Sequence, residues 1–152
     1  FLLPRRFDLS YIDNEGNKQI PVVIHRAILG TFDRFTAFIL EETKGALPLW
    51  LSPTQICVIP VNNNYHLEYA KEINDLLLAN NIRVKLDDRD EKLGYKMREA
   101  QMQKIPFTLV IGDKEKENNT VTYRKYGDDK QIEINKEDFI EMLNYMIKNK
   151  ER

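Results

Sequence analysis

The sequence predicts an α/β fold whose larger part holds a mixed five-stranded sheet and three helices. Between residues 54 and 111, short and almost continuously apolar runs alternate with segments of helical periodicity. That alternation is typical of a βαβαβ unit with a parallel sheet covered on both faces. After residue 119, two alternating polar and apolar runs flank a glycine-containing turn, and an amphipathic helix follows. These last elements add an antiparallel hairpin and a helix to the parallel unit.

Each element of this part is predicted from its local pattern. Apolar or alternating runs predict strands over residues 55–61, 82–86, 107–111, 120–126 and 131–134. Apolar residues at helical spacing predict helices over residues 64–79, 92–103 and 136–148. The residues that we expect in the core are Tyr69, Ala70, Ile73, Leu76 and Leu77 in the first helix, Leu93, Met97 and Ala100 in the second, and Phe139, Ile140, Leu143, Met146 and Ile147 in the third.

The amino-terminal part predicts an antiparallel hairpin. Residues 7–12 and 19–28 surround a turn cluster at 14–17. We expect the second strand to end in His25 and Arg26, just before a glycine.

A helix and a connector follow this hairpin. From residue 30 to about residue 43 the spacing is helical, with Phe32, Phe35 and Ile39 as the expected core face. Residues 46–53 are apolar and contain two prolines. We therefore predict a domain over 1–45, a connector over 46–53 and a second domain over 54–152.

Composition limits the classes of function. The 152 residues carry a formal net charge of −1, so bulk positive charge cannot drive nucleic-acid binding, and any RNA contact must be made by a few placed groups. No apolar run is long enough to span a bilayer. The sole cysteine, Cys57, lies in an apolar run and predicts a buried free thiol in a reducing cytoplasm. The chain begins with Phe1 and an apolar triplet, and we expect a fragment boundary there.

Nucleotide binding and nucleophilic catalysis find little support in the second domain. The turn after its first strand, residues 61–64, contains no glycine, and no phosphate-binding fingerprint occurs in the chain. Cys57 lies in the middle of a strand. His66 lies in the first turn of a predicted helix on a polar stretch, where we expect a solvated imidazole.

His25 and Arg34 are the candidate ligand-binding residues of the first domain. An imidazole and a guanidinium at one end of a strand–helix unit suit a metal or a phosphate-bearing ligand. A zinc site needs three or four ligands, and the chain offers no second histidine or cysteine near His25. Arg34 shares a stripe with Thr31 and Phe38, apart from the expected core face, and suits a base or a phosphate. A structural histidine and a solvated arginine explain the same residues.

The second domain has a denser polar cluster. Residues 87–92 end its second strand and open a helix, for which Asp90 is the expected N-cap. The outer face of that helix is expected to carry Lys96, Arg98 and Lys104.

Glu115 and Arg124 extend this cluster. Residues 112–115 follow the third strand at the carboxyl edge of the sheet, where open α/β sheets place ligands. Arg124 points away from Val121 and Tyr123, with Tyr126 beside it. A carboxylate, a guanidinium and aromatic rings at one edge can read unstacked RNA bases. Solvated charged turns produce the same pattern.

Several longer segments carry a family resemblance. These are the runs LPRRFDL at 3–9, HRAILGTFDRF at 25–35, PLWLSP at 48–53, DRDEKLGYKMREA at 88–100 and IPFTLVIGDKE at 105–115. Together they resemble the carboxy-terminal part of bacterial threonyl-tRNA synthetases, which are class II aminoacyl-tRNA synthetases. Residues 3–9 resemble the strand before the third signature motif of that class, and residues 25–35 resemble the motif itself.

The resemblance implies roles for the first domain. Residues 1–45 would be the carboxy-terminal remnant of a class II catalytic domain. His25 would be one of three protein ligands of a zinc ion that recognises threonine, Arg34 would contact ATP, and Thr31 would line the pocket. The first two class II motifs and the other zinc ligands are absent from the chain. The resemblance therefore implies a fragment that is itself inactive and binds no cofactor alone, from a parent that uses zinc and ATP with magnesium.

The resemblance also implies that residues 54–152 form an anticodon-binding domain. Glu115 and Arg124 would contact anticodon bases of threonine tRNA, and Asp90 stands where the family commonly has asparagine. The parent would be a cytoplasmic homodimer that contacts neither DNA nor a membrane. The alternative is a non-catalytic accessory or regulatory module that uses the same fold for protein contacts. A flavodoxin-like small-molecule binder is disfavoured by the glycine-poor first turn.

Overall fold

The computed structural model describes residues 1–151, and the chain forms two compact units that meet between Phe38 and Ile39. This division falls inside a helix, α2 (Phe32–Glu42). The domain boundaries expected at 45 and 54 remain a prediction.

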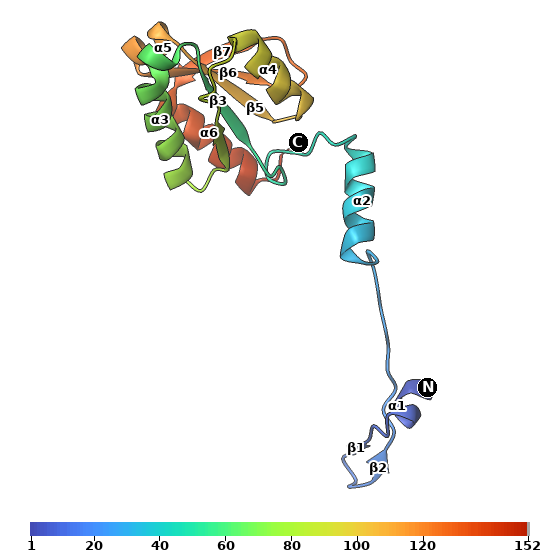
Figure 1. Ribbon diagram of the computed structural model, residues 1–152. Coiled ribbons are helices and arrows are strands. Elements are labelled where there is room, and N and C mark those ends of the chain that lie inside the picture. The colour runs from blue at the N-terminus through green and yellow to red at the C-terminus, as the bar shows by residue number, and fades with distance from the viewer. Residues whose placement is uncertain (152) are drawn as a thin grey trace. The chain divides into compact units, whose positions relative to one another are not determined.

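The second unit contains the predicted five-stranded mixed sheet (Figure 1). Its strands lie in the order β4 (Val84–Leu86), β3 (Ile56–Pro60), β5 (Phe107–Ile111), β6 (Thr120–Lys125) and β7 (Gln131–Asn135). The first three are parallel, and the last two continue the sheet in antiparallel fashion. The predicted α/β fold class is confirmed.

Helices cover both faces of this sheet. On one face, α3 (Asn63–Ala79) and α6 (Lys136–Lys148) pack against the main core, while α4 (Leu93–Met102) covers a smaller cluster on the other. β3 supplies both layers: Ile56 and Val58 face α3 and α6, whereas Cys57 and Ile59 face α4. Every residue of β3 is buried, as the continuous apolar run predicts.

Aromatic packing fixes the position of α6. Its Phe139 ring lies 6.0 Å from Phe107 and 5.1 Å from Tyr123, measured between ring centroids. All three residues are almost fully buried. Burying one such side chain contributes about 1.5–3 kcal/mol.

A short helix, α5 (Asp113–Asn118), lies between β5 and β6 and was not predicted. The sequence predicts three helices in this part and a charged turn over residues 112–115. The segment has no apolar periodicity because none of its residues is buried. Gly112 precedes it, and a Cβ there would lie 3.2 Å from Glu115 Oε2, so glycine permits the close approach of that carboxylate.

The first unit has less strand than predicted. The hairpin is reduced to β1 (Tyr11–Ile12) and β2 (Lys18–Gln19), paired over two residues each. Residues 20–28 form no strand, so the expected strand end at His25 is wrong. Residues 3–9, where the family resemblance implies a strand, form none: the short helix α1 (Leu2–Arg6) covers the first part of this run. An isolated two-stranded ribbon is only marginally stable in water. The strand residues here are all exposed, so apolar burial does not stabilise a longer pairing.

Helix α2 forms as predicted, but its expected core face is not buried. Phe32 is 84% exposed, and no residue of the helix is buried. The helix is held locally: the Thr31 Oγ1 atom accepts a hydrogen bond from the Arg34 N–H at 3.3 Å. Gly30 has φ of +75°, and a Cβ there would lie 3.3 Å from Arg34 Cδ.

Candidate functional site

Glu115 is held at the carboxyl edge of β5 by two hydrogen bonds. Its Oε2 accepts from the backbone N–H of Gly112 at 2.9 Å, which satisfies a free donor at the start of α5. Its Oε1 accepts from Thr122 Oγ1 at 2.5 Å. The half-buried carboxylate is therefore fixed against β6.

Arg124 lies on the same face of β6, two residues from Thr122. Val121 and Tyr123 point into the core formed with α3 and α6, so Thr122 and Arg124 face the side of α4, as the sequence predicts. The Arg124 Nε donates to the Asp128 carbonyl oxygen at 2.7 Å, and its Nη2 pairs with the Asp129 carboxylate.

The structure thus places Glu115 and Arg124 on one surface. Arg124 lines a hollow of about 400 Å³ between the β6–β7 turn and α4, together with Arg98, Gln101, Met102, Tyr126, Gly127 and Asp129. The hollow combines two guanidinium groups, an amide and an aromatic ring. Such groups donate to base edges and phosphates and stack on bases.

Asp90 lies in a different hollow, which shares no lining residue with that of Arg124. It lies beyond the end of β4, near residues Val61, Asn62, Asn63, Asn64, Arg89, Glu91 and Lys96. Helix α4 begins later than expected: its N-cap is Lys92, which makes no side-chain capping bond. The expectation that Asp90 caps this helix is therefore wrong, and the carboxylate of Asp90 is exposed.

An ion-pair cluster shapes the chain around Asp90. The Arg89 Nε and Nη2 atoms donate to the two carboxylate oxygens of Asp87 at 2.8 and 2.7 Å, and Nη2 also donates to Glu99 at 2.6 Å. These bonds from Arg89 lower the pKa of the Asp87 carboxyl below its usual range. The cluster fixes residues 87–89 against α4.

Lys96 is buried rather than on the outer face of α4. It is only 2% exposed, and its Nζ donates to the Asp87 carbonyl oxygen at 3.1 Å. Helical spacing alone places Lys96 on a polar face. Its acceptor, the carbonyl oxygen of Asp87, lies after the preceding strand, so the helical pattern around Lys96 does not indicate that this side chain is buried.

His66 is likewise buried, against the expectation of a solvated imidazole. It is 4% exposed. Its Nδ1 accepts from the backbone N–H of Asn62 at 3.1 Å, and its Nε2 lies 2.9 Å from Asp113 Oδ1. The second partner lies 47 residues away, so sequence spacing could not reveal it.

The candidate residues of the first unit are exposed. Arg34 and Thr31 lie together at the start of α2, while His25 lies in a segment without regular structure. Within residues 1–151, no group of three or more histidine, cysteine, aspartate or glutamate side chains could hold a metal ion.

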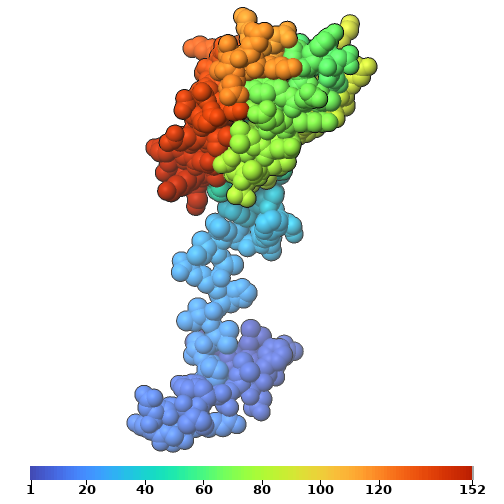
Figure 2. Space-filling view, turned by 90° about the vertical axis from the view of Figure 1, so that its left-hand side faces the viewer, coloured from blue at the N-terminus to red at the C-terminus, as the bar shows by residue number. Residues whose placement is uncertain are grey.

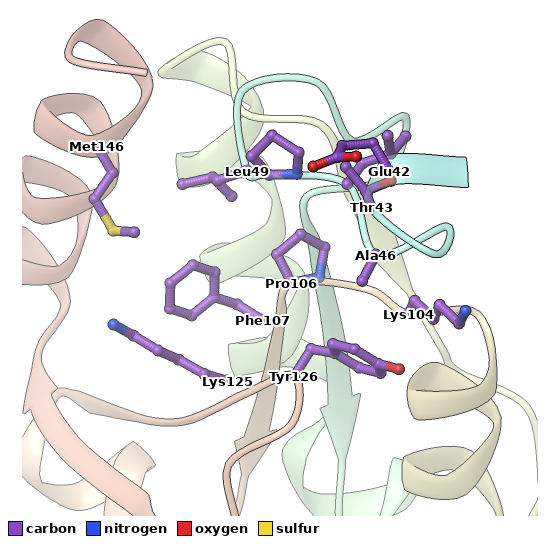
Figure 3. Close-up of a pocket in the computed structure, with 12 residues that line it drawn as sticks. Glu42, Thr43, Ala46, Leu49, Lys104, Pro106, Phe107, Lys125, Tyr126 and Met146 are labelled. Carbon is purple, nitrogen blue, oxygen red and sulfur yellow. The ribbon is translucent and has the colours of Figure 1, made fainter. Parts of the chain in front are cut away.

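An apolar hollow lies at the amino end of β5, whereas Glu115 follows the carboxyl end of that strand. Figure 3 shows the side chains that line this hollow. Leu49, Pro106, Phe107 and Met146 form much of its wall, and the Nζ of Lys125 lies 5.7 Å from the centroid of the Phe107 ring. The predicted connector contributes Leu49, which is buried. This hollow offers apolar packing surface and lacks the carboxylate–guanidinium arrangement of the β6 face.

The mixed sheet, with helices on both faces and polar side chains at its carboxyl edge and on the α4 side of β6, defines a small three-layer α/β domain. A family profile described as an anticodon binding domain matches residues 55–145. The chain belongs to this family of anticodon-binding domains.

Similar proteins agree with the threonyl resemblance. The chain is 57% identical over 140 residues to a threonine–tRNA ligase of Staphylococcus carnosus and 55% identical to one of Staphylococcus aureus, covering 92% of this chain in each case. It spans only 22% of the length of each of those relatives. A solved RNA-binding domain of threonyl-tRNA synthetase from Cryptosporidium parvum matches with a TM-score of 0.82 and 37% identity, over 96% of this chain and 37% of that one.

Among the described residues, no helix combines the length and the apolar character needed to cross a bilayer.

Proposed function

We propose that this chain is the anticodon-reading part of a threonine–tRNA ligase. The observation that carries the proposal is the identity of 57% to a threonine–tRNA ligase, which extends through an anticodon-binding domain. The surface at Glu115 and Arg124 supports it because both side chains reach the same face of β6.

The chemistry of the two side chains suits base recognition. A carboxylate oxygen has more than one acceptor direction, so Glu115 accepts from an amino or imino group of a base while it keeps its bonds to Thr122 and Gly112. The Arg124 guanidinium has five N–H donors, of which the β6–β7 turn uses two, and the others donate to a base edge. Asp90, exposed in the separate hollow near Asn62, would add a second acceptor.

Bulk electrostatics contributes little to this recognition. The formal net charge is −1, so RNA affinity depends on a few placed cations such as Arg98 and Arg124. We expect weak, salt-sensitive binding of the threonine anticodon stem-loop by the isolated chain.

For the parent protein we propose ATP-dependent attachment of threonine to its tRNA. Zinc, bound in part by His25, would recognise threonine, and Arg34 with Thr31 would contact ATP and its pocket. We further infer a cytoplasmic, dimeric parent. Because this chain spans 22% of its relatives, we expect it to catalyse no threonine activation. A threonine-dependent pyrophosphate exchange signal from the purified chain would contradict that expectation.

The test is titration of the chain with the threonine anticodon stem-loop and with stem-loops whose anticodon bases are changed. Fluorescence anisotropy at moderate salt gives each affinity. We expect the cognate stem-loop to bind more tightly, and Glu115→Gln or Arg124→Gln to remove about 1–3 kcal/mol of that preference.

Two matched variants on α6, Glu141→Gln and Lys148→Gln, are exposed and control for the loss of a charge. They should leave the preference unchanged. Indistinguishable curves for all stem-loops would instead favour a module that uses this fold for protein contacts.

A further inference from the structure

His66 is a buried histidine that links two elements at the carboxyl edge of the sheet. Its ring lies on α3 and is 4% exposed. Because Nδ1 accepts from the Asn62 N–H at 3.1 Å, the neutral ring carries its proton on Nε2. That proton is donated to Asp113 Oδ1 at 2.9 Å, at the first position of α5.

Helix α5 has no apolar anchor of its own. It comprises six residues, none of them buried. A helix this short is not stable alone, so contacts from outside must hold it.

The contacts that hold α5 are polar. Two join it to the start of α3: the bond from His66 to Asp113, and a bond of 3.2 Å from the Lys116 Nζ to the Tyr65 carbonyl oxygen. Lys116 is exposed, whereas His66 is enclosed. Figure 2 shows α5, in orange, beside the green start of α3.

We propose that His66 is a positioning residue that holds α5 against α3 and thereby sets Glu115 for RNA recognition. Glu115 follows Asp113 by two residues and projects from the same short helix. The inference rests on the proposed function, because it assigns His66 a task only if Glu115 contacts RNA.

Because the imidazole is enclosed, water does not easily take the place of Asp113 as its hydrogen-bond partner. Water cannot replace Asp113 at a ring that is 4% exposed without entering the space between α3 and α5. The Asp113 side chain is 84% exposed, so its replacement removes the link without disturbing the core.

The experiment uses Asp113→Ala as the main variant and His66→Gln as the second. Hydrogen exchange of the amides of residues 113–119 measures how firmly α5 is held, without RNA. Affinity for the threonine anticodon stem-loop is then measured in the native background and in the Glu115→Gln background. Asp75→Ala, an exposed position in the middle of α3, is the matched control.

We expect Asp113→Ala to accelerate exchange in α5 by about fivefold, which corresponds to the loss of one hydrogen bond. Stem-loop affinity should fall severalfold in the native background and stay nearly unchanged in the Glu115→Gln background. Asp75→Ala should change neither quantity.

Unchanged exchange in α5 on both Asp113→Ala and His66→Gln would overturn the proposal. An equal affinity loss in the two backgrounds would also overturn it, because the effect would then not pass through Glu115. If Glu115→Gln itself leaves stem-loop binding unchanged, the base-reading function fails and the RNA part of this inference fails with it. The exchange measurement still decides whether His66 holds α5.

Discussion

The hydrogen bond between Thr122 and Glu115 is the contact that fixes the candidate carboxylate against the sheet. The Thr122 Oγ1 and Glu115 Oε1 atoms are 2.5 Å apart, a spacing typical of a hydroxyl that donates to a carboxylate. The perturbation is a double-mutant cycle of Thr122→Val, Glu115→Ala and the two combined. Valine keeps the shape of threonine and removes only the donor.

The magnitude follows from the surroundings of the bond. A hydrogen bond to a charged group contributes about 1.5–3 kcal/mol. Both residues here are half-buried, so water partly replaces the hydroxyl in the variant. Glu115 also keeps its bond to the Gly112 N–H. We therefore expect a coupling free energy of about 1 kcal/mol.

Urea denaturation of the four proteins, followed by circular dichroism, measures the free energy of unfolding. Because the cycle subtracts each single effect, the loss of the helix cap at Gly112 does not enter the coupling. A coupling below about 0.3 kcal/mol, the usual error of additivity, would refute this reasoning. The carboxylate would then not be held by β6.

Three further predictions concern the core and its ion pairs. Burial raises the pKa of the Cys57 thiol to about 11, so iodoacetamide should label it at pH 8 far more slowly than a free thiol, and at a rate that rises on unfolding. Phe139→Ala should lower the free energy of unfolding by about 3–5 kcal/mol, whereas Phe139→Leu should cost markedly less. The lowered pKa of Asp87 means that its ionised form stabilises the fold fully above the unfolded pKa of about 3.9, and that this contribution disappears as the pH falls through the lower folded value. The difference in urea midpoint between the native protein and Asp87→Asn should therefore be constant from pH 7 to about pH 5 and shrink below about pH 4.

The parts of the fold that sequence predicts well are those whose partners are generic apolar surface. Helix α6 spans residues 136–148 as predicted, because its apolar stripe requires only a core to pack on, and the Asn135 side chain marks its start by accepting from the Glu137 N–H. Strand β3 is predicted for the same reason: its continuous apolar run is buried on both faces.

The parts that sequence misses depend on particular polar partners. His66 and Lys96 both lie on polar stretches of amphipathic helices, and both are buried because one acceptor or donor lies at the right place in another element. Helix α5 is missed because polar bonds rather than apolar periodicity hold it. Phe32 shows the opposite case, since its helical spacing is that of a core residue and yet its side chain is exposed.

The candidate site at Glu115 and Arg124 is only partly predictable from sequence for the same reason. Glu115 and Arg124 lie on different elements. Their positions relative to the predicted strands indicate that both lie near the sheet edge. What brings them to one face is the antiparallel pairing of β5 with β6, in which Val110 opposes Thr122 and Thr108 opposes Arg124. Shifting this register by one residue would turn Arg124 into the core and point Thr122 away from Glu115. The alternation of buried Val121 and Tyr123 forbids that shift, so the apolar core of β6 also fixes the geometry of its polar face.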